Sequence, residues 1–77
     1  MKTYVVMIGT LPTAAASTLE AAQANAFEAE KPYISEGAEI RWDEHRPGSA
    51  WRLMTRPKGR RFAWTQRWVA AVPTADA

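Results

Sequence analysis

The chain has 77 residues, which is enough for one small domain and leaves no room for a second hydrophobic core. With 47% hydrophobic and 23% charged residues it has the composition of an ordinary folded protein, which excludes collagen-like, coiled-coil and disordered chains. The absence of cysteine excludes disulfide bridges, thiolate catalysis and cysteine-ligated zinc. We expect one domain over residues 1–72 and a disordered tail at 73–77.

The longest apolar run, from Tyr4 to Ile8, is too short for a membrane span or for the apolar part of a signal peptide. We therefore expect a cytoplasmic protein with no membrane partner. The formal net charge of +2 hides an uneven distribution: residues 1–45 contain three cations and seven acids, whereas residues 46–77 contain seven cations and one acid. The basic half favours an anionic partner.

The first 16 residues predict one strand and one connection. The β-branched and aromatic run at residues 2–8 has apolar groups on both faces, which is typical of a strand that is paired centrally or covered on both sides. Gly9 and Pro12 then predict a connection over 9–16, with a helix start as early as Pro12 or Thr13 left open.

A helix is expected from Ser17 onward. Ser17 and Glu20 match a capping box, in which the hydroxyl accepts from an orphan amide and the carboxylate reaches back to the cap. The alanine-rich stretch that follows has high helix propensity, and its small side chains would let a partner surface approach closely. Pro32 should end the helix near Lys31.

The rest of the chain predicts a three-stranded meander. Apolar and polar residues alternate from Ala38, again over 50–56, and again over 61–72, with turn residues at 46–49 and 57–60. The predicted fold class is α+β, of order β-α-β-β-β, with one helix packed on one face of a four-stranded, mostly antiparallel sheet.

Alternation within these strands predicts opposite faces for the apolar and the arginine side chains. The residues expected to face the helix are Ile40, Trp42, Trp51, Leu53, Phe62, Trp64 and Trp68. Arginines would then share the open face, where their planar forks suit phosphate oxygens. The predicted nucleic-acid or partner-binding residues are Arg41, Arg52, Arg56, Lys58, Arg60, Arg61 and Arg67.

Tryptophans beside arginines, as in Trp51-Arg52 and Arg67-Trp68, can stack on bases of single-stranded nucleic acid. Strand parity instead favours a packing role for three of the four tryptophans, with Trp68 the one expected to be partly exposed.

Three functions remain open. The first is a non-enzymatic binding protein for DNA, RNA or a nucleoprotein complex. The second is a protein-interaction or homodimerisation module in which the arginines meet carboxylates. The third is an RNA-cleaving toxin that uses His45 with Arg46 and Arg52. No cofactor or metal site is predicted, and we expect no enzymatic activity.

The pattern also resembles that of small phage and mobile-element proteins, among them anti-CRISPR inhibitors of type I surveillance complexes. The matching features are the strand at Thr3–Ile8, the segment Ser17-Thr18-Leu19-Glu20-Ala21-Ala22, and the turn-bounded strands with Trp51, Lys58-Gly59-Arg60 and Trp68. The resemblance implies a stoichiometric binder that blocks a nucleoprotein machine. Many such inhibitors are acidic DNA mimics, and the basic face of this chain departs from that pattern.

Overall fold

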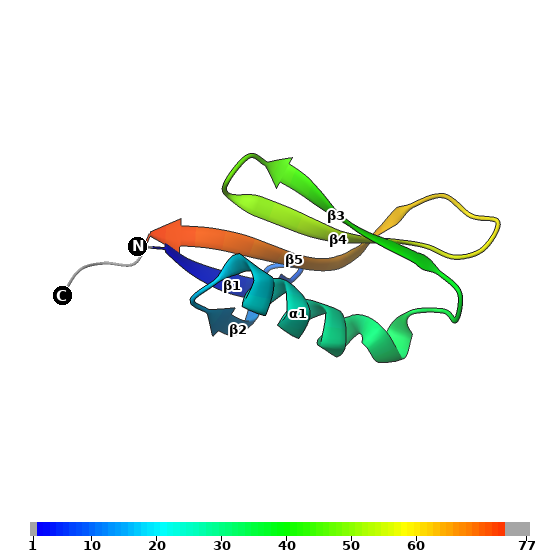
Figure 1. The fold of residues 1–77 in the computed structure, drawn as a ribbon, viewed down its shortest axis with the longest axis horizontal. Coiled ribbons are helices and arrows are strands. Elements are labelled where there is room, and N and C mark those ends of the chain that lie inside the picture. The colour runs from blue at the N-terminus through cyan, green and yellow to red at the C-terminus, as the bar shows by residue number, and fades with distance from the viewer. Residues whose placement is uncertain (1, 74–77) are drawn as a thin grey trace.

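The computed structural model describes residues 2–73, which form one α-helix and a five-stranded antiparallel sheet (Figure 1). The strands are β1 (Lys2–Ile8), β2 (Leu11–Ala16), β3 (Glu39–Arg46), β4 (Ala50–Arg56) and β5 (Ala63–Pro73). The helix α1 (Leu19–Glu30) continues into a short 3-10 helix, η1 (Lys31–Tyr33). The sheet order β2-β1-β5-β4-β3 places β5 in the centre. The α+β class is confirmed, whereas the predicted order β-α-β-β-β lacked one strand.

The missing strand is β2, which had been predicted as a connection. Ile8 pairs with Leu11 across a two-residue turn, and Gly9 has a φ of +59° at the first turn position, where a type II′ hairpin turn requires glycine. Pro12 lacks an amide but lies on the edge of the sheet, and the register shifts there so that Thr13 is skipped. Pairing with β1 overrides the helix propensity of the alanines. Of the two arrangements that the sequence left open for β1, the structure has the strand paired on both sides.

The helix begins one residue later than the capping box predicted. Thr18, not Ser17, is the cap: its backbone is extended, and its hydroxyl accepts a hydrogen bond from the amide of Ala21 at 3.1 Å. At the other end α1 stops at Glu30, and Pro32 lies in η1, so the predicted end is confirmed to within one residue.

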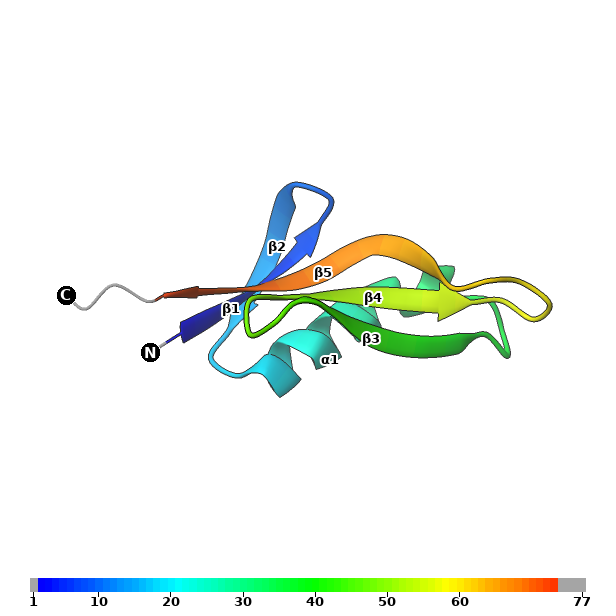
Figure 2. The ribbon, with the colours of Figure 1, turned by 90° about the horizontal axis from the view of Figure 1, so that it is seen from above.

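The centre of the core lies between α1 and the two central strands. The helix packs on β1, β2 and β5, on one side of the sheet (Figure 2). Val6 of β1, Val69 of β5, and Ala22 and Ala26 of the helix form one cluster in which every residue is 0% exposed. Because both helix residues are alanines, helix and sheet come close together, and only side chains of moderate size fit between them.

The prediction of helix-facing residues is correct for β4 and for Trp42 of β3, whereas Ile40 of β3 is 37% exposed and the prediction is wrong for Phe62 and for β5. Trp42 and Trp51 pack against the core cluster, and Leu53 is fully buried. In β5, however, Val69 faces the helix, so alternation turns the neighbouring Trp68 to the opposite face. Phe62 and Trp64 also lie on that face, under the guanidinium groups of Arg41, Arg56 and Arg52. The residue of β5 that joins the alanines in the core cluster is thus a valine, while the β5 tryptophans lie on the other face.

A bulge in β5 sets the spacing of two of these aromatic residues. Arg52 pairs with Trp68, and Met54 pairs with Trp64, so two steps along β4 correspond to four along β5. Gln66, in the middle of the bulge, has a φ of +75°. Because the bulge takes up two extra residues, Trp64 and Trp68 lie on the same face of the sheet. They stand opposite β4 residues that are two positions apart, whereas without the bulge their partners would be four positions apart.

Pro73 is the last residue of β5, and the rest of the predicted tail, 74–77, lies outside the described residues. Neither helix in the described part of the chain combines the length and the apolar character that spanning a membrane requires.

The close approach of α1 to the sheet leads to a first prediction. Replacing Ala26 by leucine should lower the free energy of unfolding by about 1–3 kcal/mol, because the larger side chain must push α1 away from Val6 and Val69. Ala24→Leu, at an exposed position of the same helix, should stay within about 0.5 kcal/mol of the parent. Urea unfolding of the three proteins measures both values, and equal midpoints for the two variants would contradict the packing described above.

Candidate functional site

The sheet face opposite α1 presents arginine and aromatic side chains together. We call this surface the open face and define it by the side chains that β3, β4, β5 and the β4–β5 loop direct away from the helix. Over the middle of the sheet its arginine and aromatic residues are Arg41, Arg52, Arg56, Phe62, Trp64 and Trp68, and Arg46 lies at its edge beside the β3–β4 turn.

Each of these arginines lies over an aromatic ring. The Cζ atom of Arg41 is 4.3 Å from the centroid of Phe62, and that of Arg56 is 5.1 Å from the same centroid. Arg52 covers Trp64 in the same way, at 5.3 Å. Each such cation–π contact is worth about 0.5–1 kcal/mol on a surface. It orients the guanidinium plane while leaving its N–H edge able to donate to a ligand.

Three more cations extend the open face at the end of the β4–β5 hairpin. The loop between these strands, at the right of Figure 1, contains Lys58, Arg60 and Arg61, and all three are exposed. None of the three side chains forms an ion pair with another residue in the 2–73 range. Gly59 has a φ of +77°, and the Arg60 amide donates to the carbonyl of Pro57 at 2.9 Å, so the loop has a defined turn.

Two acids lie on the open face and neutralise it only in part. Glu39 forms an exposed ion pair with Arg56, whose side chain is 42% exposed. Asp43 is the cross-strand neighbour of Arg52, but these two side chains form no ion pair. Six of the seven predicted site residues therefore lie on the open face or its loop, and they outnumber the acids there.

Arg67, the seventh predicted residue, lies on the other side of the sheet, and its predicted placement is wrong. It is only 8% exposed, and its Nε donates to a carboxylate oxygen of Glu30 at 3.1 Å. The register that turns Val69 toward α1 also turns Arg67 that way, since the two are two residues apart on β5. The guanidinium therefore connects the end of α1 to the sheet and does not reach the open face.

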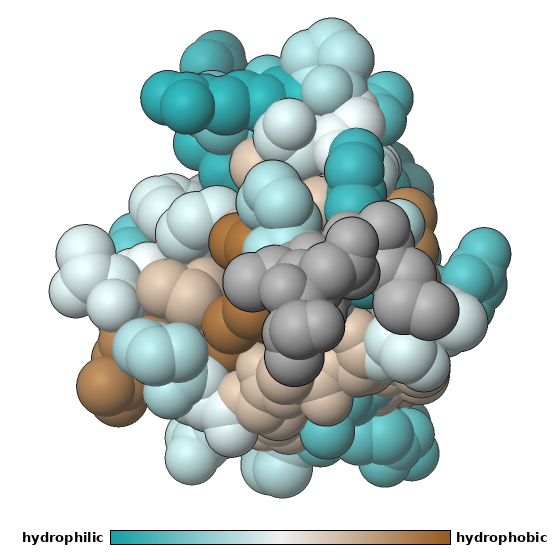
Figure 3. All heavy atoms as spheres, turned by 90° about the vertical axis from the view of Figure 1, so that its left-hand side faces the viewer, coloured by the Kyte–Doolittle hydropathy of each residue, from teal (hydrophilic) through white to brown (hydrophobic). Residues whose placement is uncertain are grey.

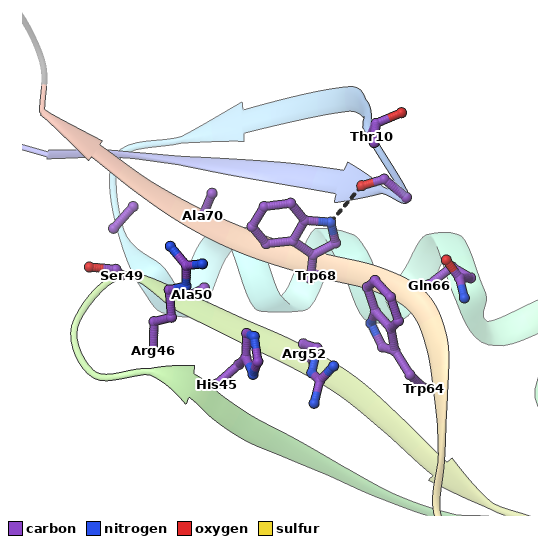
Figure 4. Close-up of a pocket in the computed structure, with 12 residues that line it drawn as sticks. Thr10, His45, Arg46, Ser49, Ala50, Arg52, Trp64, Gln66, Trp68 and Ala70 are labelled. Carbon is purple, nitrogen blue, oxygen red and sulfur yellow. Dashed lines mark hydrogen bonds between the residues drawn. The ribbon is translucent and has the colours of Figure 1, made fainter.

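A concavity of about 750 Å³ opens between the β3–β4 turn, the middle of β5 and the β1–β2 turn (Figure 4). His45, Arg46 and Arg52 line one side of it, and Trp64 and Trp68 line the other.

Figure 3 shows that hydrophilic side chains gather at the top of that view, which is the side of the β3–β4 hairpin. His45 belongs to β3, and Trp64 and Trp68, which were predicted to face the helix, line the concavity instead.

Hydrogen bonds to the backbone hold both indoles in place. The Nε1 of Trp68 donates to the carbonyl of Gly9 at 2.7 Å, which ties β5 to the β1–β2 turn. The Nε1 of Trp64 donates to the carbonyl of Arg67 at 3.2 Å, across the bulge. Both indole donors are thus satisfied within the protein, and the Trp68 ring lines the concavity without an arginine over it, whereas Arg52 lies over Trp64.

Arg52 is the least satisfied polar group of the concavity. Its Nε is buried without a hydrogen-bond partner, and the side chain makes no ion pair within residues 2–73. A ligand in the concavity would meet the terminal nitrogens of this guanidinium, because the Nε itself is closed to solvent. With no carboxylate paired to it, the cation can accept an anionic group without losing a partner.

Comparisons of the chain with protein-family models, with curated proteins and with solved structures found no match. Within residues 2–73, no three histidine, aspartate or glutamate side chains come together as a group that could hold a metal ion.

The two ion pairs lead to a second prediction, because they differ in burial. Removing the carboxylate of the Arg67 pair with Glu30→Ala should cost about 2–4 kcal/mol of stability, since it leaves a guanidinium buried without its partner. Removing that of the Arg56 pair with Glu39→Ala should cost less than about 1 kcal/mol, since water replaces the carboxylate. Chemical denaturation gives both values, and similar losses would show that Arg67 is not held as described.

Proposed function

We propose that this protein binds nucleic acid through its open face and acts by occupancy, without catalysis. The observation that supports this best is the set of three arginines stacked on aromatic rings, on a surface continuous with the cationic β4–β5 loop. Guanidinium forks donate to phosphate oxygens in pairs, and aromatic rings stack on bases, so the two chemistries of a nucleotide are both matched.

The charge distribution supports the same proposal. Only Arg56 among the six predicted cations of this surface has an ion pair within residues 2–73, and that pair is exposed. The other five have no carboxylate partner there and can approach phosphates without losing one. An exposed sheet face made only for solubility would not require arginine in preference to lysine, or rings beneath the arginines.

A stoichiometric inhibitor of a nucleoprotein complex, which the resemblance to type I anti-CRISPR inhibitors implies, would use this face on guide RNA or target DNA. That role is a narrower form of the same proposal, because it also requires phosphate contacts from the open face.

A second candidate is RNA cleavage, favoured by the arrangement of His45, Arg46 and Arg52 on one side of the concavity. An imidazole near two guanidinium groups could act as a base beside a phosphate. We expect no cleavage, because no second acid or base lines the concavity.

Our third prediction concerns affinity and salt. Labelled single-stranded DNA and RNA of about 15 nucleotides should bind at about 50 mM salt. If all six cations contact phosphates, the logarithm of the affinity should fall with the logarithm of salt with a slope of about −4. The affinity would then be roughly 300-fold lower at about 200 mM salt. Fluorescence anisotropy at several salt concentrations measures the slope.

A matched pair of single variants locates the contacts. Arg60→Gln should reduce the magnitude of the slope by about 0.7, because one phosphate contact is lost. Lys31→Gln removes one cation from η1, at the end of the helix, and should leave the slope unchanged. No binding of DNA or RNA at low salt would overturn the proposal. Light scattering would then favour self-assembly if it found a dimer that dissociates in salt.

The fourth prediction tests catalysis. Labelled RNA incubated with the protein should remain intact, and His45→Ala should behave like the parent. Cleavage by the parent that His45→Ala abolishes would establish a ribonuclease and contradict action by occupancy.

A further inference from the structure

The residues that line the concavity beside Trp64 and Trp68 fit a narrower class of ligand than the open face as a whole does. We infer that it takes one unpaired nucleobase of a single strand, stacked on the indole of Trp68, while the adjoining phosphate meets Arg46 and Arg52. This inference rests on the proposed function and adds to it a base-stacking site, and with it a preference for single-stranded over duplex nucleic acid.

The shape of the concavity follows from the strand register. Next to the Arg52–Trp68 pair, Ala50 pairs with Ala70, and Ala50 is only 6% exposed. Two small side chains thus form a low floor beside a large ring. The bulge around Gln66 places Trp64 two β4 positions from Trp68, which is roughly 7 Å of strand. The result is a hollow with an aromatic wall on the open side of the sheet (Figure 4).

The two indoles are organised before any ligand arrives. Their N–H groups are engaged with the carbonyls of Gly9 and Arg67, so neither ring needs to be reoriented on binding. Such preorganisation reduces the entropy cost of association. It also means that the rings can stack on a base but cannot read its edge through the indole N–H, which favours binding of any base over binding of one sequence.

Arg52 provides an independent indication of an anionic ligand in the same place. Its guanidinium is held over Trp64, and no carboxylate within residues 2–73 pairs with it. His45 and Arg46, both exposed, stand on the same side of the concavity. A phosphate next to the stacked base would meet two guanidinium groups there.

A base-stacking site of this kind should bind single strands more tightly than duplexes. A base enters a concavity and stacks on an indole only when it is unpaired and turned out of its own stack, which costs a duplex a few kcal/mol. Phosphate contacts alone would bind both forms.

The test changes the ligand and leaves the protein intact. One oligothymidylate of about 15 nucleotides is compared with an oligonucleotide of the same length whose central positions are abasic, so that the number of phosphates is equal. The intact strand should bind roughly 5- to 100-fold more tightly, which is the effect of one stacked base. Tryptophan emission should fall on binding the intact strand and change little with the abasic one. A duplex of the same length should bind more weakly than the single strand.

Variants place the stacking at the concavity. Trp68→Leu should remove most of the difference between the intact and the abasic strand, while its slope with salt stays close to that of the parent. Tyr33→Leu, which removes a 78% exposed aromatic ring outside the open face, should keep the difference. If Trp68→Leu does not fold, as circular dichroism would show, the emission change in the parent decides the matter.

The outcomes separate this inference from the proposed function. Equal affinity for intact, abasic and duplex ligands would overturn the base site while leaving phosphate binding by the open face in place. Failure of every ligand to bind at low salt would overturn both.

Discussion

The close contact of two alanines with two valines determines how the rest of this molecule is arranged. Ala22 and Ala26 of α1 and Val6 and Val69 of the two strands β1 and β5 form one cluster in which all four residues are fully buried. With Val69 turned toward the helix, alternation along β5 turns its larger neighbour Trp68 to the other face. The orientation of Val69 therefore determines which β5 side chains reach the open face.

The register of β5 buries one charge under the helix and turns aromatic rings toward solvent, and both groups are covered by other side chains. Arg67 is turned under the helix together with Val69, where a lone guanidinium would be costly, and Glu30 at the end of α1 supplies the opposite charge. On the open face, rings that would otherwise meet water are covered by arginines. The same β5 register thus produces one buried ion pair and one surface of stacked cations.

Much of the fold is predictable from the sequence because its signals are local. The bounds of β1 and β4 follow directly from β-branched residues and alternation, and Pro32 marks the end of the helix. The β2 strand gave no such signal, since its alanines and Pro12 acquire their conformation from pairing with β1. For β5, alternation shows which residues share a face but not which face meets the helix. That choice depends on the depth of the core, which is a tertiary property.

An arginine that lies over a half-buried ring has two effects on the open face, one in the free protein and one on binding. In the free protein the guanidinium shields apolar ring surface from water, which limits self-association through exposed aromatics. The planar cation meanwhile keeps its N–H edge free, so a phosphate can bind without first displacing the ring. At the concavity the shield covers Trp64 but not Trp68, whose ring lies beside the alanine floor. The uncovered ring is therefore the point at which the surface can bind a flat ligand.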